Sequence, residues 1–104
     1  AEDLQDELLA HASLLVEFGP NLGRPMVDTL KGSRHANMKE LRFRATSGAW
    51  RLAFAFDPRR HAILLASRDK SGVGQRRFYR RLISTADQRF EIHLERVAGN
   101  RSRV

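Results

Sequence analysis

Alternation of apolar and polar side chains in the middle of the chain constrains the fold more than any other feature of the sequence. Successive residues of a β-strand point to opposite faces of a sheet, so a period of two predicts strands with one apolar face. The period holds on both sides of a predicted turn at residues 46–49. Its apolar positions are Leu41, Phe43, Ala45, Trp50, Leu52, Phe54 and Phe56, and polar residues between them include Glu40, Arg42, Arg44 and Arg51. We therefore predict a β-hairpin over residues 38–56.

A third strand follows the predicted hairpin. The Asp-Pro-Arg-Arg sequence at residues 57–60 is typical of a turn. Residues 61–67 include five consecutive apolar residues at 62–66, as in a strand that is covered on both faces. The three strands predict an antiparallel meander.

Two helices are expected to pack with this meander. Apolar residues recur at helical spacing over residues 3–18 and again from Phe78 to Val97. Residues 21–37 contain glycines, a proline and few apolar positions, which favours an ordered loop or a short helical turn. We expect one α+β domain over residues 1–104, in which a three-stranded antiparallel meander packs with an N-terminal helix and a C-terminal helix.

Charge is divided unevenly along the chain. Residues 1–30 hold six acids and one Arg, whereas residues 31–104 hold eighteen Lys or Arg and six acids, and the net charge is +7. The basic residues alternate with apolar ones, so they are expected on folded structure, where a basic face attracts a polyanion such as nucleic acid. Simple solubility of an Arg-rich surface is the alternative.

Other classes of protein are disfavoured by what the sequence lacks. Cysteine is absent, and the four histidines, at positions 11, 35, 61 and 93, match no zinc motif, so we expect neither a metal site nor a cofactor. No apolar run approaches the roughly 18 residues of a membrane span, and the chain starts with acids, unlike a secretory signal. We expect a cytoplasmic protein without a membrane partner.

A candidate site follows from the strand pairing. If the large apolar residues of the hairpin face the helices, then Arg42, Arg44 and Arg51 point together to the opposite face. Like charges at this distance repel one another, so the arrangement suits either full exposure to water or an anionic ligand. Glu40 is the acid available beside them.

Further candidate groups lie after the third strand. Lys70 follows this strand. Tyr79 is the single tyrosine of the sequence and lies one position from the apolar stripe of the closing helix. Cleavage of RNA without a metal requires a base for the 2′-hydroxyl, cations at the phosphate and an acid for the leaving oxygen. Arg42, Arg51, Lys70 and Tyr79 have suitable groups for these roles, and a packing role for Tyr79 remains the alternative. Around them we expect RNA contacts from Lys31, Arg34, His35, Lys39, Arg44, Arg68, Arg76 and Arg77.

Several motifs resemble the phage-derived Gp49-like, HigB-type branch of the RelE/ParE toxin superfamily. They are Gly-Pro-Asn-Leu-Gly-Arg-Pro at 19–25, Leu-Lys-Gly-Ser-Arg-His at 30–35, Met-Lys-Glu-Leu-Arg at 38–42, Trp-Arg-Leu-Ala-Phe-Ala-Phe-Asp-Pro-Arg-Arg at 50–60, Asp-Lys-Ser-Gly at 69–72 and Arg-Phe-Tyr at 77–79. The resemblance implies a RelE-like fold and a toxin that cleaves mRNA in the ribosome. It also implies a cognate helix-turn-helix antitoxin, and it assigns the family's catalytic positions to Arg42, Arg51, Lys70 and Tyr79.

One departure from the family concerns the start of the chain. Such toxins usually begin with an extra strand before the segment that matches Glu2, and this sequence begins at Ala1. A sheet edge without its usual neighbour predicts self-association through an exposed N-terminal region. Two other functions stay open: a ParE-like toxin that binds gyrase without cutting RNA, and a basic RNA- or ribosome-binding module without catalysis.

Overall fold

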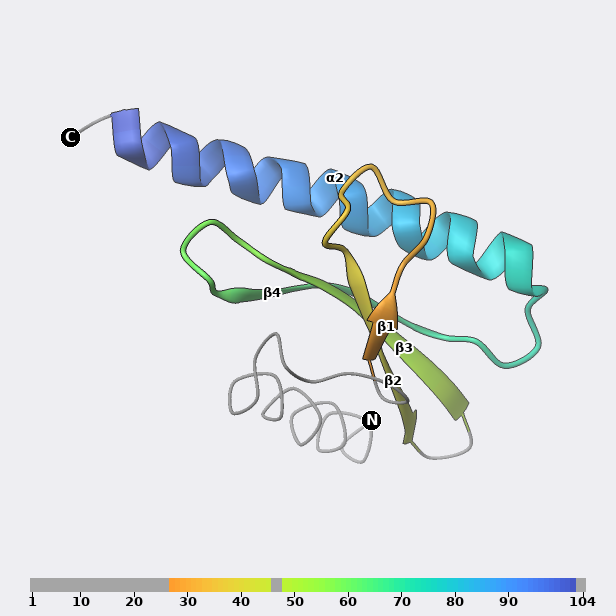
Figure 1. Ribbon diagram of the computed structural model, residues 1–104. Coiled ribbons are helices and arrows are strands. Elements are labelled where there is room, and N and C mark those ends of the chain that lie inside the picture. Colours follow the sequence, from red (N-terminus) through yellow and green to blue (C-terminus); the bar gives the residue numbers. More distant parts are fainter. Residues whose placement is uncertain (1–26, 46–47, 103–104) are drawn as a thin grey trace.

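A computed structural model describes residues 27–45 and 48–102 of the chain (Figure 1). The described elements are β1 (Val27–Thr29), β2 (Lys39–Ala45), β3 (Gly48–Phe56), β4 (Ala62–Asp69) and α2 (Gln75–Ser102). The strands form one antiparallel sheet in the order β1-β2-β3-β4, and α2 lies across it. The predicted α+β class is therefore confirmed. The predicted helix over residues 3–18, and the self-association assigned to that region, lie outside the described residues.

The three predicted strands are present, and the sheet also contains a fourth. β1 has three residues and pairs with β2, with Val27 opposite Leu41 and Thr29 opposite Lys39. The expectation of a loop or short helical turn over residues 21–37 is wrong for β1, because this strand is formed by pairing with its neighbour β2 and not by a pattern of its own. Gly48 and Ala49, predicted as part of the turn, belong to β3.

The connection between β1 and β2 is a loop over residues 30–38 that reaches α2. Ser33 Oγ donates to Asp87 Oδ1 at 2.5 Å, and the amide of Arg34 donates to Asp87 Oδ2 at 3.0 Å. Gly32 has a φ of 100°, a conformation that glycine adopts without a Cβ clash. The loop is thus fastened to the helix over one face of the sheet (Figure 1).

Two separate apolar clusters hold the sheet, and they draw on alternate positions of the strands. The first cluster joins the small residues Ala53 and Ala55 of β3 to the α2 residues Phe78, Leu82 and Phe90. The second contains the large residues of the hairpin, namely Leu41, Phe43, Leu52 and Phe54, together with Val27. Because neighbouring strand residues point to opposite faces, the two clusters lie on opposite sides of the sheet.

This arrangement corrects one prediction about the sheet faces. The large apolar residues of the hairpin are buried, as predicted, but α2 packs on the other face, which is the face that carries Arg42 and Arg51. The alanines of β3 explain the choice, since their small side chains leave room for the ring of Phe78 and the side chain of Leu82. The two arginines are therefore brought close to α2 instead of facing away from it.

The turn between β3 and β4 forms where predicted and is also fastened to α2. Asp57 Oδ1 accepts hydrogen bonds from the amides of Arg59 and His61, both at 2.9 Å. Its Oδ2 is 2.9 Å from His93 Nε2 on α2. Asp57 is buried, so this pair joins the far end of the hairpin to the middle of the helix. In the described part of the chain no helix is both long and apolar enough to cross a membrane.

Candidate functional site

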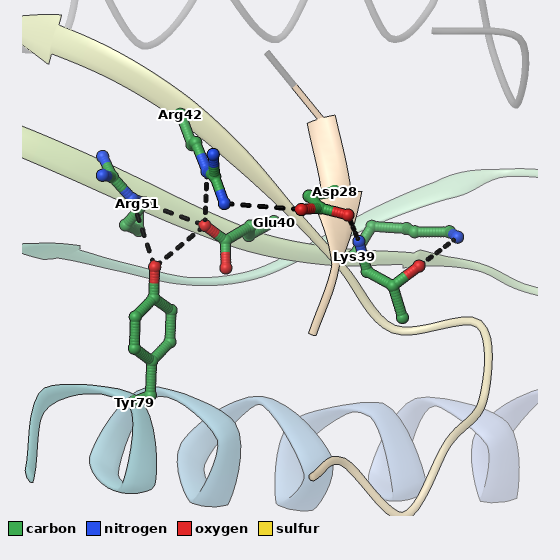
Figure 2. Close-up of polar contacts among 7 residues, drawn as sticks. Asp28, Lys39, Glu40, Arg42, Arg51 and Tyr79 are labelled. Atoms are coloured by element: carbon green, nitrogen blue, oxygen red, sulfur yellow. Dashed lines mark hydrogen bonds and ion pairs between the residues drawn. The ribbon is translucent and has the colours of Figure 1, made fainter. Parts of the chain in front are cut away.

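A buried carboxylate lies at the centre of the candidate site. Glu40 on β2 is only 3% exposed, and its Oε1 accepts hydrogen bonds from Tyr79 Oη and from Arg42 Nε, both at 2.9 Å. Arg51 Nε on β3 lies 3.4 Å from the same oxygen. Three elements therefore converge on one carboxylate oxygen (Figure 2). We call these four residues, Glu40, Arg42, Arg51 and Tyr79, the Glu40 cluster.

Strand pairing and helix packing both build this cluster. Arg42 and Arg51 are direct cross-strand partners, and Glu40 lies two residues from Arg42, so all three share one face of the sheet. Tyr79 follows Phe78, whose ring is buried in the first apolar cluster, and this packing directs the neighbouring tyrosine toward the sheet. Figure 2 shows the hydroxyl of Tyr79 pointing from the helix to Glu40.

The hydroxyl of Tyr79 is kept in its protonated form. Burial raises its pKa, because the phenolate loses contact with water, and the hydrogen bond to the Glu40 carboxylate raises the pKa further. The hydrogen bond that Tyr79 Oη accepts from Arg51 Nε, at 3.4 Å, acts in the opposite direction but is outweighed. Tyr79 can therefore donate a proton at neutral pH.

The two arginines of the cluster have different surroundings. The hydrogen bond to Glu40 raises the pKa of Arg42, whose Nη2 also lies 3.5 Å from Asp28 Oδ2. Arg42 thus meets two acids, although 42% of its side chain is exposed. Arg51 is 15% exposed, and its Nη1 donates to the carbonyl oxygen of Trp50 at 3.0 Å. Arg51 is the more rigidly held of the two.

Lys70 supplies a third cation beside the cluster. Its Nζ lies 5.5 Å from the centre of the Tyr79 ring, within the range of a cation–π interaction. Its amide donates to the carbonyl oxygen of Ala49 at 2.8 Å, which fixes the backbone at this position. No ion pair joins Lys70 to an acid among residues 27–45 and 48–102. Its charge is therefore available to a ligand.

An open cleft of about 440 Å³ borders the cluster. Glu40, Arg42 and Tyr79 line it, together with Lys31 and Arg76. Cations from the loop, the sheet and the helix thus line the cleft beside Tyr79, together with the acids Asp28 and Glu40. The cations outside the Glu40–Arg42–Asp28 contacts, Lys31 and Arg76, suit an anion that enters the cleft.

The other sequence-predicted contact residues are scattered around this centre. Arg68 is the cross-strand partner of Arg51, while Arg44 and Arg77 are exposed at some distance along their own elements. Lys39 Nζ donates to Thr29 Oγ1 at 3.0 Å, at the pairing of β1 with β2 (Figure 2).

Arg34 and His35 lie away from the Glu40 cluster. Both contact Glu91 on α2, Arg34 through Nη2 at 2.9 Å and His35 through Nε2 at 3.1 Å. Glu91 is twelve residues beyond Tyr79, or about 18 Å along the helix. The His35 ring also packs edge-on against Phe90, with centroids 5.0 Å apart. These contacts fasten the loop to α2 and separate His35 from the candidate site.

Glu40 is a candidate site residue that is absent from the set predicted by the sequence. The sequence shows it only as the acid near the arginines, on a face expected to point away from the helices. The i, i+2 spacing of Glu40 and Arg42 already put the two side chains on one face. Among the described residues no three His, Asp or Glu side chains gather in an arrangement that could hold a metal.

The fold and the cluster define a small α+β protein with an arginine–carboxylate–tyrosine site between its sheet and its long helix. The family described as "Phage derived protein Gp49-like" matches residues 1–91, and the chain belongs to this family. No solved structure matches the chain at a significant level.

Two curated relatives come from Mycobacterium tuberculosis. The protein named "Putative toxin HigB2" is 47% identical over 88 residues, which are 84% of this chain and 43% of that protein. The protein named "Putative toxin HigB3" is 53% identical over 78 residues, which are 75% of this chain and 66% of that protein. The matched segments are therefore shorter than two thirds of either relative.

Proposed function

We propose that this chain is the toxin of a type II toxin–antitoxin pair and that it cleaves mRNA on the ribosome. The Glu40 cluster carries the proposal, because it combines a protonated tyrosine with fixed cations at an open cleft. The toxin names of the two relatives and the membership of the Gp49-like family support the same function. A cognate helix-turn-helix antitoxin, mRNA and the ribosome are the proposed partners.

The proposed reaction uses the RNA's own 2′-hydroxyl as the nucleophile. The O2′–P bond forms as the P–O5′ bond breaks, the proton of the 2′-hydroxyl passes to a base, and O5′ takes up a proton. Tyr79 is suited to give the proton to O5′, since its raised pKa keeps it neutral until the leaving oxygen becomes basic. Glu40 orients the tyrosine hydroxyl and balances the charge of the arginines.

Charge on the phosphate grows during this reaction and calls for fixed cations. Arg51 and Lys70 are the best placed, because Arg51 is held by its backbone contact and Lys70 forms no ion pair with an acid in the described chain. Arg42 shares its charge with Glu40 and Asp28, so we expect it to position Glu40 and to contribute less to the phosphate. Preorganised charges of this kind commonly provide the largest part of catalysis.

Primer extension on translated mRNA tests the proposed function. Purified chain added to a translating system should produce discrete cuts, and Arg51→Ala or Tyr79→Phe should each reduce the cutting rate by about 10²-fold with the fold retained. Arg96→Ala, which removes an exposed arginine in the C-terminal part of α2, is the matched control and should cut nearly as fast as the parent. Absence of cutting by a folded parent chain would contradict the proposal.

Two alternative functions can be separated in the same preparation. A ParE-like toxin would inhibit supercoiling by gyrase and leave mRNA intact. A basic RNA- or ribosome-binding module would bind without cutting and would tolerate Tyr79→Phe. Neither alternative explains why a tyrosine hydroxyl and a buried carboxylate should meet beneath the arginines.

A further inference from the structure

The loop over residues 30–38 brings a lysine to the cleft at the Glu40 cluster. Lys31 lines this cleft together with Arg76 and Tyr79. It is exposed, and it forms no ion pair among residues 27–45 and 48–102. Its place at the cleft depends on the course of the loop, which crosses α2 between β1 and β2 (Figure 1).

Apolar packing fixes only the two ends of this loop. Leu30 and Met38 are buried in the first apolar cluster, and the amide of Leu30 donates to the carbonyl oxygen of Met38 at 2.9 Å. Between these ends an open hollow of about 420 Å³ lies beside the loop, lined by Gly32 and Arg34 of the loop and by Ile83 of α2. The middle of the loop is therefore held mainly by polar contacts.

A buried carboxylate on α2 provides the central polar contacts. Asp87 is only 4% exposed, its Oδ1 accepts from the Ser33 hydroxyl at 2.5 Å, and its Oδ2 accepts from the amide of Arg34 at 3.0 Å. The Ser33 hydroxyl in turn accepts a hydrogen bond from the amide of His35 at 3.0 Å. Burial of a carboxylate is costly unless hydrogen bonds compensate it, and for Asp87 the loop supplies them. One side chain thus organises three consecutive loop residues.

Lys31 lies between two fixed points of the loop. Leu30 on one side is buried, and Ser33 on the other side is bonded to Asp87. The remaining link is Gly32, whose φ of 100° belongs to a region that glycine enters and leaves readily. While Ser33 is held, the backbone at Lys31 keeps its course and the side chain stays at the cleft. Loss of the Asp87 contacts would let the loop turn about Gly32 and move Lys31 away.

We propose that Asp87 is a positioning residue that holds Lys31 at the cleft, where Lys31 binds a phosphate of the RNA strand. The inference rests on the proposed cleavage of RNA and adds a group that controls how the strand is bound. Asp87 is eight residues beyond Tyr79, or about 12 Å along the helix, so it acts through Lys31 and does not touch the reacting atoms.

Binding of an uncleavable RNA to the full chain tests the proposal without any cleavage. The probe is a short single-stranded RNA with 2′-O-methyl groups, which has no free 2′-hydroxyl to attack the phosphate. Removal of an acid should by charge alone strengthen binding of a polyanion, whereas we expect Asp87→Asn to weaken it about threefold. Glu95→Gln makes the same charge change at an exposed position of α2, and this matched control should bind at least as tightly as the parent.

A double-mutant cycle shows whether Asp87 acts through Lys31. Lys31→Ala should also weaken binding about threefold, as expected for one exposed ionic contact. If the two residues act together, the double variant should bind about as weakly as either single variant, whereas independent effects would multiply to about tenfold. A tenfold loss in the double variant, or parent-like binding by Asp87→Asn, would overturn the proposal.

Ser33→Ala keeps the cycle decisive if Asp87→Asn does not fold. It removes one of the two hydrogen bonds to the loop and leaves the buried carboxylate in place. We expect it to weaken RNA binding about twofold to threefold, and to add nothing to the loss caused by Lys31→Ala. Additive losses from Ser33→Ala and Lys31→Ala would contradict the proposal.

Cleavage kinetics separate this inference from the proposed function. Asp87→Asn should raise KM about threefold and leave kcat within about twofold of the parent, because it changes how the strand is bound and no reacting group. A lower kcat at unchanged KM would contradict the positioning role. Cutting by the parent with independent effects of Lys31 and Asp87 would leave the proposed function standing and remove this inference. Coupled effects on RNA binding in a chain that does not cut RNA would do the reverse.

Discussion

At the scale of single residues, the neighbours of Tyr79 in the Glu40 cluster shift the pKa of its hydroxyl in opposite directions. Burial and the hydrogen bond to Glu40 raise its pKa, whereas the hydrogen bond from Arg51 lowers it. Because Tyr79 is the one tyrosine of the sequence, the ultraviolet absorbance of tyrosinate reports this residue alone.

We expect the Tyr79 titration in the folded parent to lie above the ordinary tyrosine pKa of about 10. Glu40→Gln keeps a hydrogen-bond acceptor and removes the negative charge, so it should lower the pKa of Tyr79. Arg51→Met removes the cation that favours the phenolate and should raise it. Shifts of the same sign in both variants would contradict the arrangement in Figure 2.

At the scale of elements, the sequence predicted the hairpin, the third strand and the closing helix, because each has a clear period. It did not predict β1, whose three residues are too few to show one. The predicted face for α2 was wrong. Both faces of β3 carry apolar residues, the alanines on one face and the large side chains on the other, and their pattern does not show which of the two faces the helix covers. Ala53 and Ala55 indicate the face that the helix covers only when their small side chains are compared with the large residues of α2 that pack against them.

The same limit applies to the candidate site. The sequence offers Arg42, Arg51, Lys70 and Tyr79 only as suitable residue types. In the structure Arg42, Arg51 and Tyr79 meet at Glu40, and Lys70 lies against the ring of Tyr79. His35 could not be placed from the sequence, because its position depends on where the loop over residues 30–38 crosses α2. Contacts between segments so far apart in the chain follow from packing and have no periodic pattern.

The core of the hairpin provides a test of the second apolar cluster. Phe54 is 1% exposed, and Phe54→Ala should reduce the free energy of unfolding by about 3–5 kcal/mol through lost contacts and a cavity. Leu64, its cross-strand partner on β4, is 47% exposed and serves as the matched control. Leu64→Ala should cost less than about 1 kcal/mol. Similar losses for the two variants in urea unfolding would show that the burial of β3 is misassigned.

The contact between Asp57 in the β3–β4 turn and His93 on α2 should make the free energy of unfolding depend on pH in the acidic range. Burial tends to raise the pKa of Asp57, but the hydrogen bonds with His93 and with the amides of His61 and Arg59 outweigh it, and the pKa is lowered. The folded state therefore holds a proton less readily than the unfolded state. The stability from this group is complete above the ordinary Asp pKa of about 3.9 and is lost as the pH falls through the lower folded value.

Thermal melts of the parent and of Asp57→Asn at pH 6 and pH 3 measure this effect. Asp57→Asn should be less stable at pH 6, because it leaves His93 without its carboxylate. It should also lose less stability than the parent between the two pH values. An equal loss in the two proteins would mean that Asp57 does not contribute to the acid sensitivity.

At the scale of the whole molecule, the distribution of charge favours an anionic partner over simple solubility. The chain has a net charge of +7, and the first turn of α2 contains arginines and no acid. Cations at the start of a helix oppose its dipole and cost stability, so this arrangement is poorly explained by folding alone. Arg76 lines the cleft beside the Glu40 cluster.

The salt dependence of RNA binding tests whether these cations act together. For single-stranded RNA the logarithm of the binding constant should fall with the logarithm of salt concentration at a slope of about −0.7 per phosphate contact. Arg51 belongs to the Glu40 cluster, Arg68 is its cross-strand partner, Lys70 lies against the Tyr79 ring and Arg76 lines the cleft. Four phosphate contacts from these residues predict a slope of about −3. Lys70→Ala should weaken binding and make the slope shallower by about 0.7.

Arg34→Ala is the matched control for that measurement. Arg34 also comes from the predicted set of RNA contacts, but its guanidinium is paired with Glu91 and lies near Asp87, away from the cluster. Its removal should leave the slope close to that of the parent. If Arg34→Ala changes the slope as much as Lys70→Ala does, the RNA follows the β1–β2 loop instead of the path past Tyr79, and the proposed phosphate position at Lys70 is wrong.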